Sequence, residues 1–214
     1  MQRFLFVLIA LILLVVGGFV AWKHFAAAQL PAEINGERVA AYVNGVPIFE
    51  NYIALLASST IQNARTVAKE NAFTPEQKKE IAGGITSSTS PEAIRGIVLT
   101  QAINEEILTQ AGLKRNFATD EIVRKAIAEQ KSYSLKDPHG KEVIAIAAKQ
   151  IGVDPAKYWD DPRVFESYRR MVARSAMESY IKDHMTRAEQ DAPRPIDQAI
   201  ADFITAEHAN VVIK

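Results

Sequence analysis

Two β-prone segments lie near opposite ends of a chain whose other periodic segments are helical in pattern. Val39–Val43 is a short apolar run, and Ala209–Ile213 is a second one that is rich in β-branched residues. A lone strand leaves its backbone N–H and C=O groups without partners, which is costly. We therefore predict that these two segments pair with each other in a small sheet, of two strands or of three if Val46–Ile48 joins it.

The residues between these segments show the three-to-four spacing of amphipathic helices. Asn44-Gly45 predicts a tight turn between the first two β-prone runs, because both residue types tolerate positive φ. We expect helices from Phe49 onward, from Thr74 to Gly83, from Ser90 to a glycine stop at Gly112, from Thr119 onward, from Val143 to Gly152, from about Arg163 to Arg187, and from Ile196 to about Glu207. The expected fold class is therefore mostly α, with several helices and one small sheet.

A long apolar run precedes this domain. Every residue from Phe4 to Trp22 is Phe, Leu, Val, Ile, Ala, Gly or Trp, with Arg3 before the run and Lys23 after it. A helix of this length spans the hydrocarbon core of a bilayer, which needs about 20 apolar residues. Arg3 favours a cytoplasmic N-terminus, so we expect a transmembrane helix with the rest of the chain outside the cytoplasm.

The leader is either retained as an anchor or removed as a signal peptide. Ala26–Ala28 is a small-residue site of the kind that signal peptidases cut, and cleavage after Ala28 would release a secreted protein. The apolar run is longer than a usual signal peptide and Lys23 separates it from the alanines, which favours the uncleaved anchor. The chain has no cysteine, so lipid anchoring through cysteine, disulfides and thiolate chemistry are all excluded.

The remaining chain is expected to form one domain behind a short linker. We assign residues 1–28 to the signal anchor, 29–38 to the linker, 39–190 to a helical domain, and 191–214 to a helix and strand that complete that domain. The 25 basic and 25 acidic residues balance, and no basic stripe is present. Nucleic acid is therefore not an expected partner.

The sequence shows no pattern of an enzyme or of a metal site. The four histidines lack the i, i+4 spacing of a helical ligand pair, and the adjacent carboxylates Glu105-Glu106 do not face one another on a helix. Asp160-Asp161 precedes Pro162 and is better explained as a helix cap. No phosphate-binding loop or nucleophile elbow follows a strand. We expect no catalytic residue, no metal, no cofactor and no nucleotide.

One cluster of aromatic and methionine residues is the candidate for contact with another polypeptide. Aromatic rings offer large apolar contact areas and methionine adapts to irregular partners. The candidate residues are Tyr158, Trp159, Phe165, Tyr168, Met171 and Met177. The alternative is that these residues pack in the core, as aromatic residues at helical spacing often do.

Several segments together resemble the N-terminal chaperone domain of SurA-type and PrsA-type extracytoplasmic foldases. The segments that carry the resemblance, in the family's order, are Val39–Ile48 with its Val-Asn-Gly, Gln101–Gly112, Ala118–Ile122 and Phe165–Met185. Those proteins usually insert one or more parvulin prolyl isomerase domains after the long helix. Here no parvulin-like pattern follows Arg187, and Ala192–Pro195 marks the place where such a domain would sit.

The resemblance implies a SurA-N-like chaperone domain without prolyl isomerase activity. The expected function is ATP-independent holding of unfolded or newly translocated polypeptides, by a protein anchored in the cell membrane with its C-terminal domain on the periplasmic or cell-wall side. One alternative is a dedicated assembly factor that binds a single membrane or envelope complex. Another is an enzyme of unrecognised type, which would require a polar pocket that the sequence does not indicate.

Overall fold

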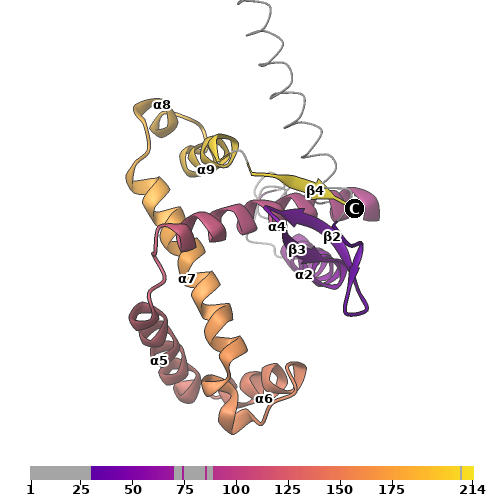
Figure 1. Cartoon of the computed structure of the whole chain (residues 1–214), viewed down its shortest axis with the longest axis vertical. Helices are drawn as coiled ribbons and strands as arrows, with labels where there is room; N and C mark the ends of the chain where they lie inside the picture. Colours follow the sequence, from indigo (N-terminus) through magenta and orange to yellow (C-terminus); the bar gives the residue numbers. More distant parts are fainter. Residues whose placement is uncertain (1–29, 70–73, 75–84, 86–88, 208) are drawn as a thin grey trace, which may run out of the picture. The chain divides into compact units, whose positions relative to one another are not determined.

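The computed structural model describes residues 30–69, 74, 85, 89–207 and 209–214 (Figure 1). This part of the chain is mostly helical, with one small antiparallel sheet, as the sequence predicts. The described chain divides into two compact units. The first comprises residues 1–100 with 210–214, and the second comprises residues 101–209.

The sheet of the first unit pairs strands from residues 33–49 with a strand near the C-terminus. Its strands, within the described residues, are β1 (Glu33–Ile34), β2 (Glu37–Val43), β3 (Val46–Phe49) and β4 (Val211–Ile213). Strand β2 pairs antiparallel with each of the other three, and Tyr42 lies opposite both Pro47 and Val212. The predicted pairing of the N-terminal and C-terminal strands is confirmed, with β3 as a further member.

Two Asn-Gly turns connect the first three strands. Asn35 and Gly36 have φ values of 52° and 80°, and Asn44 and Gly45 have 51° and 85°. These positive values match the two-residue hairpin turn that Asn-Gly favours. The first turn makes residues 33–38 part of a hairpin, whereas the sequence suggested a linker over 29–38. A linker-like composition concealed a strand pair because strands this short carry little periodicity.

Among the described helices, α2 (Glu50–Lys69) makes the most extensive contact with this sheet. Helix α2 contacts β2 and β3, and Glu50 at its start forms an ion pair with Arg95 of α4 (Pro91–Lys114). The buried apolar residues of the first unit include Val39, Ala40, Ala41, Tyr42, Val43, Ile48, Ile53, Ile85, Ile94, Val98 and Leu99. The core of this unit therefore includes most of β2 together with residues of α2 and α4.

The second unit is helical. It comprises the part of α4 from Gln101, then α5 (Asp120–Lys136), α6 (Gly140–Gln150), the 3₁₀ helix η1 (Pro155–Asp160), α7 (Pro162–Asp183), α8 (Arg187–Gln190) and α9 (Pro195–Ala206). Helix α7 contacts α5, η1 and α9, and α6 contacts both α5 and η1. Helix α7 is thus the element around which most of this unit is built (Figure 1).

Two groups of buried apolar residues line α7. The first joins α4, α7 and α9, and consists of Leu108, Ala111, Met177, Ile181 and Ala199. The second joins the loop before α5, α5 itself and α7, and consists of Ala118, Val123, Ile127 and Ala173. Phe165, Tyr168 and Trp159 are partly buried and pack against the second group.

Three helix boundaries differ from the sequence-based expectation. Gly112 lies inside α4, which continues to Lys114, and Asn116 with φ 58° follows the helix end in place of the expected glycine. Helix α6 begins at Gly140 instead of Val143. Helix α7 ends at Asp183, before the expected Arg187, because Thr186 starts α8 with a capping box. The predicted caps at Thr119 and at Asp161 before Pro162 are confirmed.

The expected anchor over residues 1–28 and the expected helix from Thr74 to Gly83 lie outside the described residues, except Thr74 itself. Among the helices that are described, none is long and apolar enough to cross a bilayer.

Candidate functional site

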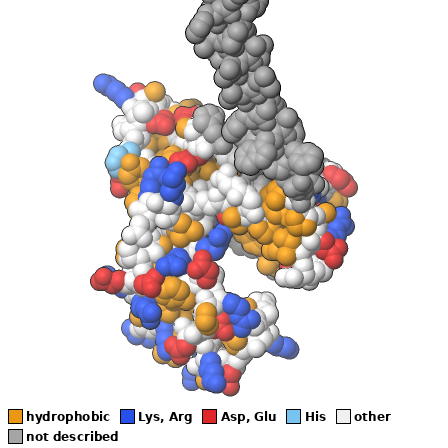
Figure 2. Space-filling view, in the orientation of Figure 1, with side chains coloured by type: hydrophobic (Ala, Val, Ile, Leu, Met, Phe, Trp, Pro, Cys, Tyr) orange, Lys and Arg blue, Asp and Glu red, His pale blue; other side chains and the backbone are white. Residues whose placement is uncertain are grey.

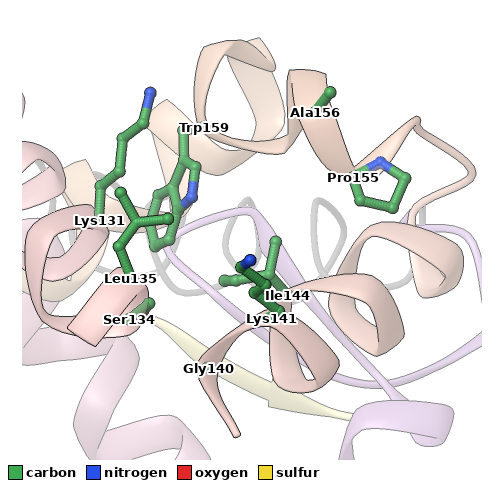
Figure 3. A pocket seen from close by; sticks show the side chains of 9 residues that line it. All are labelled: Lys131, Ser134, Leu135, Gly140, Lys141, Ile144, Pro155, Ala156 and Trp159. Carbon is green, nitrogen blue, oxygen red and sulfur yellow. The ribbon is translucent and has the colours of Figure 1, made fainter. Parts of the chain in front are cut away.

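An open apolar pocket lies in the second unit, between α5, α6 and η1 (Figure 3). Its volume is about 350 Å³, which falls in the range of small-ligand and side-chain pockets. It is lined by Lys131, Ser134 and Leu135 of α5, Gly140, Lys141 and Ile144 of α6, and Pro155, Ala156 and Trp159 of η1. Three short sequence segments therefore supply the whole lining.

The pocket exists because the chain turns back twice within a short stretch. The first turn brings Gly140 against α5, so closely that a Cβ on Gly140 would lie 1.8 Å from the carbonyl oxygen of Ser134. The second follows α6, where Gly152 has φ 68°. Asp154 then caps η1 by accepting a hydrogen bond from the Ala156 N–H at 2.8 Å. These local features fix the three walls of the pocket relative to one another.

Apolar side chains supply most of the pocket surface. Figure 3 shows Leu135 beside the indole ring of Trp159, with Ile144 on the α6 wall. Leu135 is 64% exposed, so most of its side chain is accessible to another molecule. Trp159 stands edge-on to Tyr158 and to Tyr168, with ring centroids 5.1 and 6.2 Å apart. Packing against two rings holds the indole in place as a fixed wall.

The charged side chains at the pocket are both basic. Lys131 and Lys141 are exposed on its two helical walls, and no carboxylate lines it. Among the described residues, neither lysine forms an ion pair, and no acceptor bonds the indole N–H of Trp159. Figure 2 shows acidic and basic side chains interspersed with apolar ones over this end of the second unit. The pocket lining itself carries positive charge alone.

The residues proposed from sequence for contact with other polypeptides have different surroundings. Trp159 lines the pocket, while Tyr158, Phe165 and Tyr168 are half-buried beside it or along the start of α7. Burial, and secondarily the neighbouring Tyr158, raises the pKa of the Tyr168 hydroxyl. Met171 is 45% exposed on α7. Met177 is fully buried in the first apolar group, so it offers no surface to another molecule in this structure.

Of the nine residues that line the pocket, only Trp159 was predicted from the sequence. Lys131 and Leu135 are spaced i, i+4 on α5, and Lys141 and Ile144 are spaced i, i+3 on α6, so each pair shares one helix face. This spacing is visible in the sequence. It could have indicated two apolar-basic faces, but only the fold shows that the two faces meet.

The described part of the chain contains no cluster of three or more His, Asp or Glu side chains that could hold a metal ion. Its most buried carboxylate, Glu106, forms an ion pair with Arg170 and accepts a hydrogen bond from Gln110. Asp161, the N-cap of α7, accepts hydrogen bonds from Arg163. Both carboxylates therefore have structural roles. Glu106 forms an ion pair between two helices, and Asp161 caps a helix.

No family model, curated protein or solved structure matches this chain. The resemblance to SurA-type and PrsA-type foldases therefore stays a sequence-based prediction.

Proposed function

We propose that this chain is a membrane-anchored, extracytoplasmic, ATP-independent chaperone that holds unfolded or newly translocated polypeptides and has no isomerase activity of its own. The observation that carries the proposal is the open apolar pocket at Leu135, Ile144 and Trp159. An unfolded chain presents large apolar side chains, and a pocket of about 350 Å³ accepts one or two of them.

The surface near the pocket supports the same proposal. Tyr133 is 66% exposed on α5, and Val143 and Ile146 on α6 are 59% and 54% exposed. Together with Leu135 they give the two adjacent helices α5 and α6 four side chains with large exposed apolar surfaces. Such a surface offers several weak contacts in addition to the pocket.

The expected affinity suits a holding function. Burying one large apolar side chain contributes about 1.5–3 kcal/mol, which alone gives weak and rapidly reversible binding. Several apolar segments on one client raise the overall affinity through effective concentration. The expected membrane anchor would add to this by keeping the pocket where chains emerge from translocation. Neither the binding of a client nor its release needs a nucleotide.

The test is suppression of aggregation by the full-length chain in nanodiscs of zwitterionic lipid. Two unrelated, chemically unfolded clients are diluted with one to several molar equivalents of chain, without ATP, and light scattering is followed. We expect dose-dependent suppression for both clients, beyond that of empty nanodiscs.

Two matched variants connect the activity to the pocket. Leu135→Ser removes a pocket side chain, and Leu55→Ser removes an equally exposed leucine of α2 that does not line the pocket, since both side chains are 64% exposed. We expect Leu135→Ser to require several-fold more chain for the same suppression and Leu55→Ser to stay close to wild type. A folded chain that suppresses neither client contradicts the proposal. Protection of a single partner would favour a dedicated assembly factor instead.

A further inference from the structure

We propose that the pocket selects client segments in which a large apolar side chain stands next to an aspartate or glutamate. This inference rests on the proposed function of the same pocket and adds a preference in its substrates. Its basis is charge complementarity, because the apolar lining carries two lysines and no carboxylate.

The two lysines occupy opposite helical walls. Lys131 lies one turn before Leu135 on α5, and Lys141 lies one turn before Ile144 on α6. In Figure 3 the stem of Lys131 runs beside Leu135 and Trp159, and its amino group points away from the ring. A lysine of this kind covers apolar surface with its methylene groups and keeps its charge at the mouth. A client carboxylate next to an inserted apolar side chain would meet that charge.

A further donor lies at the same opening. The indole N–H of Trp159 has no acceptor among the described residues, and an indole nitrogen is a donor only. This donor adds to the two lysines and favours an acidic group over a basic one. The start of α6 adds no further preference, because Asp137 already accepts a hydrogen bond from the His139 N–H at 2.8 Å and Glu142 lies in the first turn.

A polypeptide is the occupant that this shape favours. Leu135 is 64% exposed, and Pro155 and Ala156 are also exposed, so the pocket is open along its mouth. A side chain in the middle of a polypeptide can enter such an open pocket from the side, so the end of the polypeptide need not enter first. A long acyl chain gains most of its affinity from enclosure along its whole length, which an open pocket of about 350 Å³ does not provide.

The test uses Trp159 as a fluorescent reporter. The chain has two tryptophans, so Trp22→Phe in the full-length protein makes Trp159 the single reporter. The protein, in nanodiscs of zwitterionic lipid, is titrated with three short peptides that share a central Leu-Phe pair. The flanking residues are glutamate in the first peptide, glutamine in the second and lysine in the third.

We expect the glutamate peptide to shift the Trp159 emission and to bind roughly three to ten times more tightly than the glutamine peptide. The lysine peptide should bind most weakly. Added salt should reduce the difference, since exposed charge pairs are screened. The double variant Lys131→Gln with Lys141→Gln should bind the glutamate and glutamine peptides equally. Lys125→Gln with Lys149→Gln removes two exposed lysines that do not line the pocket, and should keep the preference.

Three outcomes would overturn the inference. Equal affinity for the glutamate and glutamine peptides removes the acidic preference. If the preference for the glutamate peptide survives the Lys131 and Lys141 substitutions, its source is not these two lysines. Binding of a fatty acid to the pocket with no binding of any peptide makes an amphiphile the occupant. Loss of the acidic preference while aggregation is still suppressed overturns this inference alone. Preserved preference without suppression of aggregation overturns the chaperone function and leaves the pocket a peptide site.

Discussion

Gly112 of α4 lies directly against the main chain of Ala173 in α7. A Cβ built on Gly112 would lie 2.1 Å from the carbonyl oxygen of Ala173 and 2.7 Å from its carbonyl carbon. Neither atom belongs to a flexible side chain, so the two helices would have to separate to admit a methyl group. This contact joins α4 and α7 close to both buried apolar groups of the second unit.

We therefore expect Gly112→Ala to destabilise the protein. Overpacking of this kind costs about 1–3 kcal/mol or more in the free energy of unfolding. Gly96→Ala in the same helix is the matched control, because a Cβ at Gly96 meets nothing within 4 Å. It should be neutral or stabilise by up to about 1 kcal/mol, since alanine is the better helix former. Urea unfolding followed by circular dichroism measures both, and equal effects would contradict the close approach.

The sheet gives a second prediction, at the turn between β2 and β3. Asn44 and Asn210 exchange hydrogen bonds at 2.8 Å. The Asn44 N–H donates to the Asn210 carbonyl, and the Asn210 N–H donates to Asn44 Oδ1. Asn44 also has φ 51°, which costs about 1–2 kcal/mol for an alanine. It thus has two separable roles, in the turn and in holding the start of β4.

Substitutions at Asn44 should separate these roles. Asn44→Gly keeps the positive φ and loses the side-chain hydrogen bond, with an expected loss of about 1 kcal/mol. Asn44→Ala loses both and should be less stable still. Asn35→Gly is the control, because Asn35 has φ 52° in the other Asn-Gly turn and no side-chain bond to β4. Thermal unfolding measures the stability of the three variants. If Asn44→Gly were as stable as Asn35→Gly, the Asn44 side chain would not contribute to holding β4.

The features that the sequence predicted correctly are those with a local signal. Asn44-Gly45 signals its turn through the two residue types alone, and Thr119 and Asp161 signal helix starts through side chains that cap the next turn. The pairing of β2 with β4 was predictable for a different reason. Any strand must find a partner for its backbone groups, and few other segments were available.

The features that were missed depend on contacts between distant segments. Gly112 near a helix end looks like a stop, and nothing in the sequence around it shows that Ala173 lies against it. Met171 and Met177 look alike in sequence, yet the first is 45% exposed and the second fully buried. The pocket depends on Gly140, which lets α6 approach α5 and so brings Leu135 and Ile144 to one opening.

A third prediction concerns the ion pair between Glu106 of α4 and Arg170 of α7. The side chain of Glu106 is 9% exposed, so removing its partner leaves a nearly buried carboxylate. We expect Arg170→Met to cost about 1–3 kcal/mol of unfolding free energy. Arg194→Met is the control, because Arg194 and Asp197 form an ion pair with both side chains at least 60% exposed. Its cost should be below about 1 kcal/mol.

The charge itself can be isolated with a double variant. Glu106→Gln combined with Arg170→Met leaves a neutral amide, which is cheaper to bury than a carboxylate. We expect the double variant to recover part of the stability that Arg170→Met loses, in urea unfolding at neutral pH. A double variant whose loss equals the sum of the two single losses would show that the pair has no coupling.

The last prediction is an acid dependence at the N-cap of α7. Arg163 donates to the Asp161 carboxylate from its guanidinium and its main-chain N–H, at 2.8–2.9 Å, and these bonds lower the Asp161 pKa from 3.8 to about 2. A lowered folded-state pKa stabilises the protein above pH 4, and the contribution is lost as pH falls toward 2. Asp161→Asn keeps an oxygen acceptor without the charge. Wild type should therefore unfold at higher urea than Asp161→Asn at pH 6, with the difference shrinking below pH 4, small at pH 2 and lost only below it. A difference that is unchanged at pH 2 would mean that the charge of Asp161 is not its source.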